Sequence, residues 1–360
     1  MINFREIIRQ NKLYTVLAAF IILLNLAIFV ARVSEKEEAE KPAAEQVTEE
    51  EVPKEKRLHF DEEEYKARQE KIEEMAKKDP KMYLFLGLLN LFIIFVILIG
   101  ILLDGYFIGR WLRKKPLEIT TNRPADPLWT IADVVRVILI FLSCGYLFVI
   151  LQAIISKWVP LLQNENFRMV FDTAMMNVVG ISVILYFIVK KYNQNISAIG
   201  LTMKRFFSNV FYAMVGYVSL VPVLLVVMLL TFVVTKWLAY KPPVQPIVQV
   251  FMEEEKASIL WISSIFAAVF GPIAEEIFFR GFMYSAIKKA FGIFWAMIIT
   301  SSIFSLLHTH IVGFLPIMLL GLLLAYLYEK TGSLVSSMAV HIAHNVGMVV
   351  LVFLARGIGT

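Results

Sequence analysis

Long apolar runs recur along the whole chain and constrain its fold more than any other feature. As a helix, a run of about 20 apolar residues crosses a hydrocarbon core of about 30 Å. Inside lipid every backbone polar group needs an internal partner, so the expected fold class is all-α: a polytopic transmembrane helical bundle of about eight or nine spans. The runs lie near residues 14–32, 82–103, 132–154, 169–189, 208–235, 258–287, 292–309, 314–328 and 333–354.

Two of these runs are short for a full crossing, those near residues 292–309 and 314–328. They follow one another with only a few residues between them. We expect them to form either two tilted spans or a re-entrant pair.

The composition excludes a soluble globule. Hydrophobic residues make up 58% of the 360 residues and charged residues only 18%, and a soluble fold of this size has too little interior for so much apolar surface. No basic soluble face is visible, so we expect no nucleic-acid partner. Cys144 is the only cysteine, which excludes an intrachain disulfide, and its apolar surroundings favour an inert core thiol.

Charge divides the chain into four predicted parts. Residues 35–81 hold 17 of the 30 Asp and Glu but only 11 of the 35 Lys and Arg, so we expect an acidic extracytoplasmic loop, disordered as far as about Pro53 and partly helical beyond it. Residues 1–34 are predicted to be an N-terminal membrane anchor. The remaining parts are a second span with a basic cytoplasmic linker, 82–128, and a transmembrane catalytic bundle, 129–356.

The first apolar run has two readings. A basic start followed by an apolar stretch also describes a secretory signal peptide. The stretch is about 17 residues long and no A-x-A-like cleavage site follows it. These features favour an anchor that is retained.

Lysine and arginine indicate the orientation, because they are enriched in cytoplasmic loops. Alternate loops carry the basic clusters, which places the N-terminus in the cytoplasm and residues 33–81 and 236–257 outside. We expect an integral protein of the bacterial cytoplasmic membrane. The clusters are Arg5, Arg9 and Lys12; Arg110, Arg113, Lys114 and Lys115; Lys190, Lys191, Lys204 and Arg205; and Lys288 and Lys289.

Charged side chains within a span are costly, so the pair Glu275-Glu276 near the cytoplasmic end of the sixth run needs a reason. Glu276 and Arg280 are four residues apart on one helical face and can pair. Glu275 is offset by about 100° and points elsewhere. Pro272 is expected to kink or restart the helix just before them. The alternative is a buried structural ion pair beside a spare glutamate.

Four of the five histidines fall within residues 308–344, downstream of the two glutamates. His341 and Asn345 are four residues apart, so both side chains face one way, and their N–H groups suit an oxyanion of acyl transfer. A carboxylate in a low-dielectric pocket is a competent base for water, and His308 is placed to orient that water with Glu275. We interpret His310 as an interfacial residue. His344 lies one turn from His341, and we interpret it as a structural residue that could tune His341.

Three motifs together resemble a known family. Glu275-Glu276-x-x-x-Arg280, Phe304-x-x-x-His308 and His341-x-x-x-Asn345 are similar in order and spacing to those of the CPBP family. This family, also called CAAX protease and bacteriocin-processing or Abi, includes the prenyl-protein endopeptidases of the endoplasmic reticulum. The resemblance covers roughly residues 190–354, so residues 1–120 fall outside it.

The resemblance implies roles for these residues. Glu275 is implied as the general base, with His308 helping to hold the water. His341 and Asn345 are implied as the oxyanion hole, and Glu276 and Arg280 as supporting residues. The family has been described both as metalloproteases and as glutamate-based enzymes without an essential metal. We favour no cofactor; if zinc is used, its ligands are expected to be Glu275, His308 and His341, although H-E-x-x-H is absent.

The predicted function is therefore an intramembrane endopeptidase that hydrolyses peptide bonds of membrane-associated or lipidated substrates. Its partners are the lipid bilayer and a peptide or membrane-protein substrate. A non-catalytic scaffold or immunity-type partner that binds peptides or membrane proteins is the alternative. A transporter with a proton relay is a third reading, and no internal repeat supports it. The sequence does not set the substrate, the cleavage site or the oligomeric state.

Overall fold

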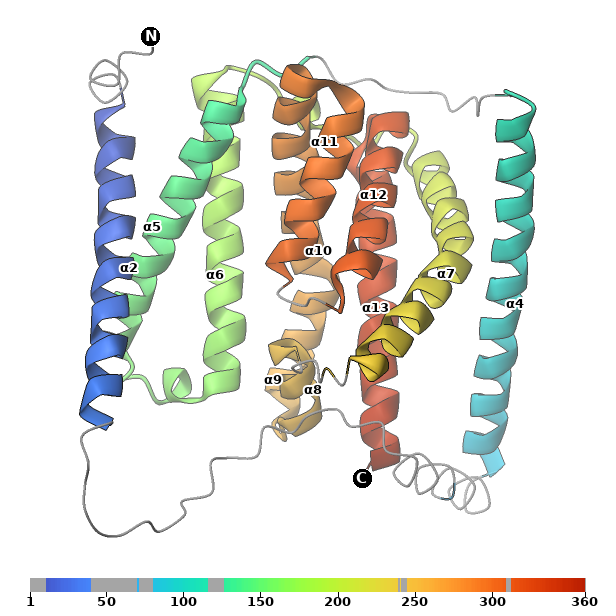
Figure 1. Ribbon diagram of the computed structural model, residues 1–360, viewed down its shortest axis with the longest axis horizontal. Helices are drawn as coiled ribbons and strands as arrows, with labels where there is room; N and C mark the ends of the chain where they lie inside the picture. The colour runs from blue at the N-terminus through green and yellow to red at the C-terminus, as the bar shows by residue number, and fades with distance from the viewer. Residues whose placement is uncertain are drawn as a thin grey trace. The chain divides into compact units, whose positions relative to one another are not determined.

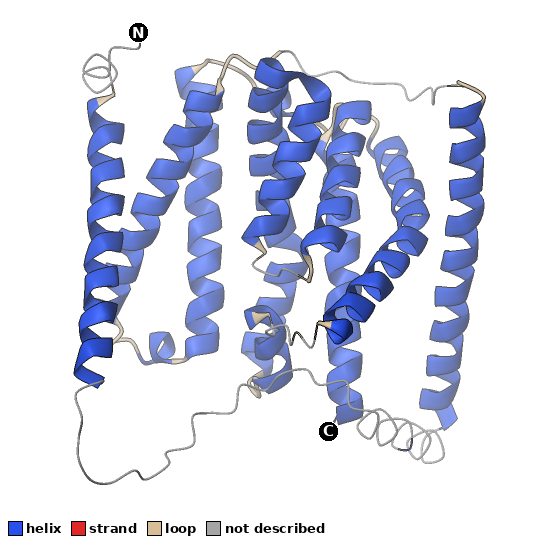
Figure 2. Ribbon diagram, in the orientation of Figure 1, coloured by secondary structure: helices blue, strands red, loops and turns tan. Residues whose placement is uncertain are grey.

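The computed structural model describes residues 11–39, 70, 80–115, 126–238, 240, 245–308 and 312–359. This part of the chain is helical and contains no β-strand (Figure 2). The predicted all-α fold class is confirmed. Most of the predicted acidic loop and residues 116–125 of the basic linker lie outside the described residues, as does His310.

In the described residues eleven α-helices follow one another, several of them joined by turns of other helical types. The π-helical turns are Tyr186–Lys191, Phe266–Phe270 and Ile277–Tyr284, and the 3-10 turns are Pro160–Gln163 and Ile196–Ile199. The α-helices are α2 (Lys12–Ala39), α4 (Pro80–Leu112), α5 (Ile131–Ile155), α6 (Glu165–Leu185), α7 (Phe206–Trp237), α8 (Pro246–Glu253), α9 (Ala257–Ile265), α10 (Gly271–Glu276), α11 (Ser285–Leu307), α12 (Phe314–Thr331) and α13 (Leu334–Gly359).

Eight helical stretches in the described residues are long and apolar enough to cross a membrane. The polytopic architecture expected from hydropathy is therefore confirmed. The predicted end of the second span is wrong, since α4 runs to Leu112 rather than to residue 103, and helix α2 continues to Ala39, past the predicted span near residues 14–32. In both places helical geometry continues into polar residues that hydropathy assigns to a loop.

The stretch Ala257–Leu307 contains 51 residues, which as one straight helix would measure about 75 Å, more than twice a hydrocarbon core. It is divided at Gly292, whose φ of 82° and ψ of 174° are not helical. Figure 1 shows the chain reversing direction within α11. The predicted separate runs near residues 258–287 and 292–309 are confirmed, with glycine at the turn because a side chain disfavours this backbone conformation.

After Gly292 the chain forms an antiparallel pair of short helical arms. The rest of α11 packs against α12, and the Ser305 hydroxyl donates to the Phe314 carbonyl at 2.6 Å across their inner ends. These ends lie well short of the C-terminal end of α13 (Figure 1). The pair therefore holds His308, which directly follows α11, within the bundle.

The helices group into two compact units. One contains the described parts of residues 1–56 and 132–183, with α2, α5 and most of α6; the other contains those of residues 57–131 and 184–360, with α4 and α7–α13. In the first unit the Asn25 amide donates to the Tyr146 hydroxyl, joining α2 to α5. The predicted functional division of the chain stays a prediction.

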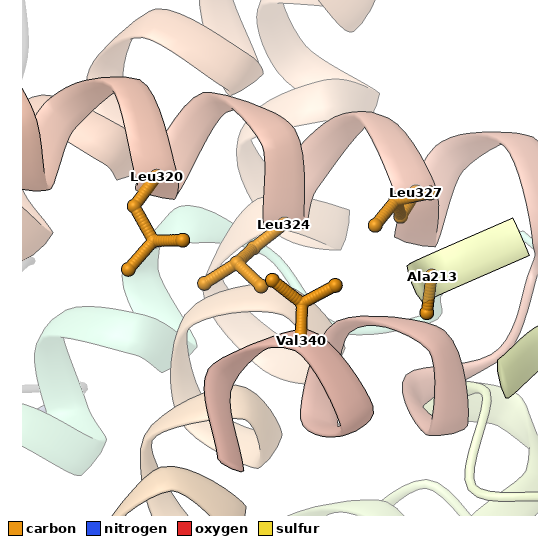
Figure 3. Packing of buried hydrophobic residues seen from close by; sticks show 5 residues of the cluster. All are labelled: Ala213, Leu320, Leu324, Leu327 and Val340. Carbon is orange, nitrogen blue, oxygen red and sulfur yellow. The ribbon is translucent and has the colours of Figure 1, made fainter. Parts of the chain in front are cut away.

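A small apolar core fixes α13 in the second unit. Ala213 of α7, Leu320, Leu324 and Leu327 of α12, and Val340 of α13 are buried against one another (Figure 3). Val340 directly precedes His341. Packing at this point therefore sets the depth and rotation of the face that carries the predicted site.

Basic residues of the second unit gather at one end of its helices. Figure 1 shows the C-terminal ends of α4 and α12, the N-terminal end of α7 and the reversal in α11 at the same end. The predicted cytoplasmic clusters at residues 110–115, 204–205 and 288–289 lie in or next to these segments, whereas Lys190 and Lys191 belong to the π-helical turn that follows α6. The arrangement agrees with the alternation expected from sequence, and the cytoplasmic assignment itself stays a prediction.

Candidate active site

The two glutamates lie in a single α-helical turn between two π-helical segments. α10 contains both, with Phe266–Phe270 before it and Ile277–Tyr284 after it. π-Helical turns shift the faces of a helix and frequently occur at functional sites. Glu275 and Glu276 lie near the middle of the stretch between Ala257 and Gly292.

Glu276 and Arg280 form a buried ion pair. Arg280 Nη1 is 2.7 Å from Glu276 Oε1, and their side chains are 1% and 0% exposed. Arg280 Nη2 donates to the Gly321 carbonyl at 3.2 Å, and its guanidinium carbon lies 4.5 Å from the centre of the Phe304 ring. The predicted pairing is confirmed, and the extra contacts help to offset the cost of burying both charges.

His341 faces a carboxylate with each ring nitrogen. Nδ1 is 2.9 Å from Glu276 Oε1, and Nε2 is 3.7 Å from Glu275 Oε2. Because the carboxylate of Glu276 only accepts, Nδ1 carries the proton of that hydrogen bond. A neutral His341 therefore has a lone pair on Nε2, and donation to an oxyanion from Nε2 requires a proton on both nitrogens.

Glu275 differs from its neighbour in both exposure and pairing. Its side chain is 34% exposed, against 0% for Glu276. Its Oε2 is nevertheless buried and, like Oε2 of Glu276, has no hydrogen-bond partner in the described residues. One carboxylate is fixed by partners and the other is available, as the 100° offset predicts.

Phe304 connects the two predicted catalytic histidines. The His308 ring lies 4.6 Å from the Phe304 ring and the His341 ring 5.5 Å from it, between ring centres. His308 Nδ1 donates to the Phe304 carbonyl at 2.7 Å, which leaves Nε2 of a neutral ring as an acceptor. No hydrogen bond joins His308 to Glu275 in the described residues, so its role toward water stays a prediction.

Asn345 and His344 have partners that the sequence motifs do not indicate. The Asn345 amide donates to the Ala267 carbonyl at 2.9 Å. Nδ1 of His344 lies 3.1 Å from the Tyr217 hydroxyl of α7. The role of Asn345 as an oxyanion donor is not tested by these contacts.

Sequence reasoning missed two residues near the site. The Ser337 hydroxyl lies beside the Glu276 carboxylate, and its position four residues before His341 was a usable signal. Tyr217 carries no such signal, because it comes from α7 and belongs to none of the three motifs.

The alternative zinc ligands are not gathered into a metal-binding group. Within the described part of the chain no three His, Cys, Asp or Glu side chains lie in an arrangement that holds a metal ion. One ring nitrogen of His341 is already bonded to Glu276. Glu275, His308 and His341 therefore do not fit zinc as arranged, and the preference for a reaction without a metal stays a prediction.

Comparison with known proteins supports the resemblance. Residues 257–347 match the sequence model of the type II CAAX prenyl endopeptidase Rce1-like family. These residues contain all three motifs. The predicted family resemblance is thus confirmed for this part of the chain.

A curated protein of Bacillus subtilis (strain 168), described as "Putative membrane peptidase YdiL", is 30% identical over 87 residues. The match covers 24% of this chain and 36% of the relative, so the chain spans about a third of the relative's length. No solved structure matches the chain.

Proposed function

We propose that this chain, whose residues 257–347 match the model of the type II CAAX prenyl endopeptidase Rce1-like family, is an intramembrane endopeptidase in which Glu275 activates water. The observation that carries the proposal is the unequal environment of the two glutamates. Glu276 is fully buried and its Oε1 is held by Arg280 and His341, whereas Glu275 is one-third exposed and its Oε2 lies 3.7 Å from His341 Nε2.

The chemistry follows from these positions. Glu275 takes a proton from water as the water oxygen bonds to the peptide carbonyl carbon, which gives a tetrahedral oxyanion. The same carboxyl group then returns the proton to the leaving nitrogen as the C–N bond breaks. The neutral His308 Nε2 accepts a hydrogen bond from the attacking water and orients it.

His341 and Asn345 stabilise the oxyanion in this proposal. Donation from Nε2 requires His341 to carry two ring protons, and the carboxylates at its two nitrogens balance that charge. With Arg280 the group then holds two positive and two negative charges. Fixed donors aimed at developing negative charge are a large source of rate enhancement in water-poor sites.

The substrate class is a peptide or protein held at the membrane. Glu275 and His341 lie on apolar spans, so a substrate that reaches them must itself enter the bilayer region. A lipid-modified or membrane-anchored peptide meets this requirement. The CAAX endopeptidase match of residues 257–347 favours a substrate cleaved near a lipidated terminus.

Glu275→Gln tests the proposal. The purified full chain in liposomes is offered a library of membrane-anchored peptides, with and without a strong chelator. We expect cleavage by wild type in both conditions and a loss of at least about 100-fold in Glu275→Gln, with an unchanged melting temperature. Glu165→Gln is the control, because Glu165 is an exposed glutamate in the other unit.

Near-full cleavage by folded Glu275→Gln would remove Glu275 as the base. Loss of wild-type cleavage with chelator would replace the proposed reaction by a metal-dependent one. Binding of peptides without cleavage by either form would favour the scaffold alternative.

A further inference from the structure

The helix that carries the two glutamates is incomplete at the Ala267 carbonyl. Residues 266–270 form a π-helical turn, in which each N–H bonds to the carbonyl five residues earlier; Gly271 bonds to Phe266 in this way. In the same register residue 272 would donate to Ala267. Residue 272 is proline and has no N–H, so the helix provides no donor at this position.

Asn345 of α13 donates the hydrogen bond to the Ala267 carbonyl that Pro272, which has no N–H, cannot donate. Its Nδ2 lies 2.9 Å from the Ala267 oxygen. Neighbouring side chains commonly satisfy the groups that proline frees in membrane helices. Because a carbonyl only accepts, the amide must turn its NH2 group toward Ala267, and this contact uses one of the two N–H bonds of Nδ2. The orientation of the amide is thereby fixed, with one N–H still available.

We propose that Pro272 is a positioning residue of the active site. By leaving Ala267 without a backbone donor, it commits the Asn345 amide to this carbonyl and so aims the second N–H of Asn345 at the substrate oxyanion. Pro272 also opens the turn that carries Glu275. The oxyanion part rests on the proposed function; the hydrogen-bond part does not.

The first experiment measures melting temperatures of wild type, Asn345→Ala, Pro272→Ala and the double variant, each as the full chain in the same detergent. In the wild-type background Asn345→Ala leaves the part-buried Ala267 carbonyl without its amide donor and lowers the melting temperature. Pro272→Ala restores the backbone N–H. We therefore expect the drop in melting temperature caused by Asn345→Ala to be less than half as large in the Pro272→Ala background as in the wild-type background. Equal losses in both backgrounds overturn the proposal.

The second experiment measures kcat and KM on a cleaved membrane-anchored peptide. A restored N–H competes with Asn345 for Ala267 and frees the amide. We expect Pro272→Ala to lower kcat about tenfold with KM within about twofold, against a loss of about 100-fold or more for Asn345→Ala. The double variant should have the kcat of Asn345→Ala alone, because both changes act on one group.

Pro222→Ala is the matched control, since Pro222 is also inside a membrane helix but packs against Gly100 of α4; it should keep kcat within about twofold. A wild-type kcat in Pro272→Ala, or losses that multiply in the double variant, overturns the positioning role. If no form of the protein cleaves, the proposed function fails, while the melting temperatures still decide the hydrogen-bond half.

Discussion

At residues 275 and 276 two identical side chains receive different surroundings from one step along a helix. Consecutive helical positions are about 100° apart, so Glu276 faces Arg280 and α13 while Glu275 is one-third exposed. His341 lies between the two carboxylates. Its Nδ1 is hydrogen-bonded to Glu276, whereas its Nε2 lies 3.7 Å from Glu275 Oε2. The difference in surroundings between the two glutamates is therefore a property of helical geometry as much as of the surrounding fold.

Arg280→Met should destabilise the protein strongly. Removing the guanidinium leaves Glu276 buried without its cation, and breaking a buried pair in this way costs about 3–5 kcal/mol. The measurement is the melting temperature and the folded yield in detergent. Arg168→Met is the control, because Arg168 and Glu165 form an exposed pair with a 3.9 Å separation and such pairs contribute about 1 kcal/mol or less. Equal melting temperatures for both variants would contradict the pairing of Glu276 with Arg280.

At the scale of elements, the contact between α4 and α7 depends on one glycine. A Cβ on Gly100 would lie 2.5 Å from the Val218 oxygen and 2.6 Å from Pro222 Cγ. One turn further along α4, Asp104 accepts a hydrogen bond from Ser219 of α7. A membrane-embedded carboxylate is thus satisfied by the same close approach that the glycine permits.

Gly100→Ala should loosen this contact. The added methyl group has no room against backbone and a proline ring, and overpacking of this kind costs about 1–3 kcal/mol. Gly105→Ala on the same helix meets nothing within 4 Å and should be neutral or stabilising, since alanine is the better helix former by about 1 kcal/mol. Melting temperatures of the two variants measure the difference. A Gly100→Ala protein at least as stable as Gly105→Ala would mean that α4 does not pack on α7 as described.

For the molecule as a whole, the uneven distribution of Lys and Arg between the two ends of the second unit predicts the orientation of the spans. The reversal at Gly292 returns the chain to the end where the basic residues gather (Figure 1). The segment before α9 lies at the other end. Basic residues are retained on the cytoplasmic side, so the end with the Gly292 turn is predicted to face the cytoplasm. The segment before α9 is predicted to be accessible from outside the cell.

Single cysteines test this orientation in a Cys144→Ser background, which contains no other cysteine. Lys289→Cys, an exposed position near the Gly292 turn, should react with a membrane-impermeant thiol reagent only after the membrane is opened. Glu255→Cys, an exposed position just before α9, should react in intact cells. The reverse pattern would invert the predicted topology.

The sequence by itself determined the all-α class, the approximate spans, the pairing of Glu276 with Arg280 and the separation of Glu275 from it. All of these are local: hydropathy is read over about 20 residues, and helical periodicity places residues four apart on one face. Span ends were less accurate where helices continued into polar residues, as at Leu112 of α4.

Only the tertiary structure decided which groups meet across helices. His341 between two carboxylates, Asn345 on the Ala267 carbonyl and Tyr217 on His344 join α13 to distant parts of the chain. These contacts depend on the rotation and axial offset of each helix, which packing around residues such as Leu324 and Val340 sets. Local sequence patterns do not encode either quantity, because each is fixed jointly by all the helices that touch.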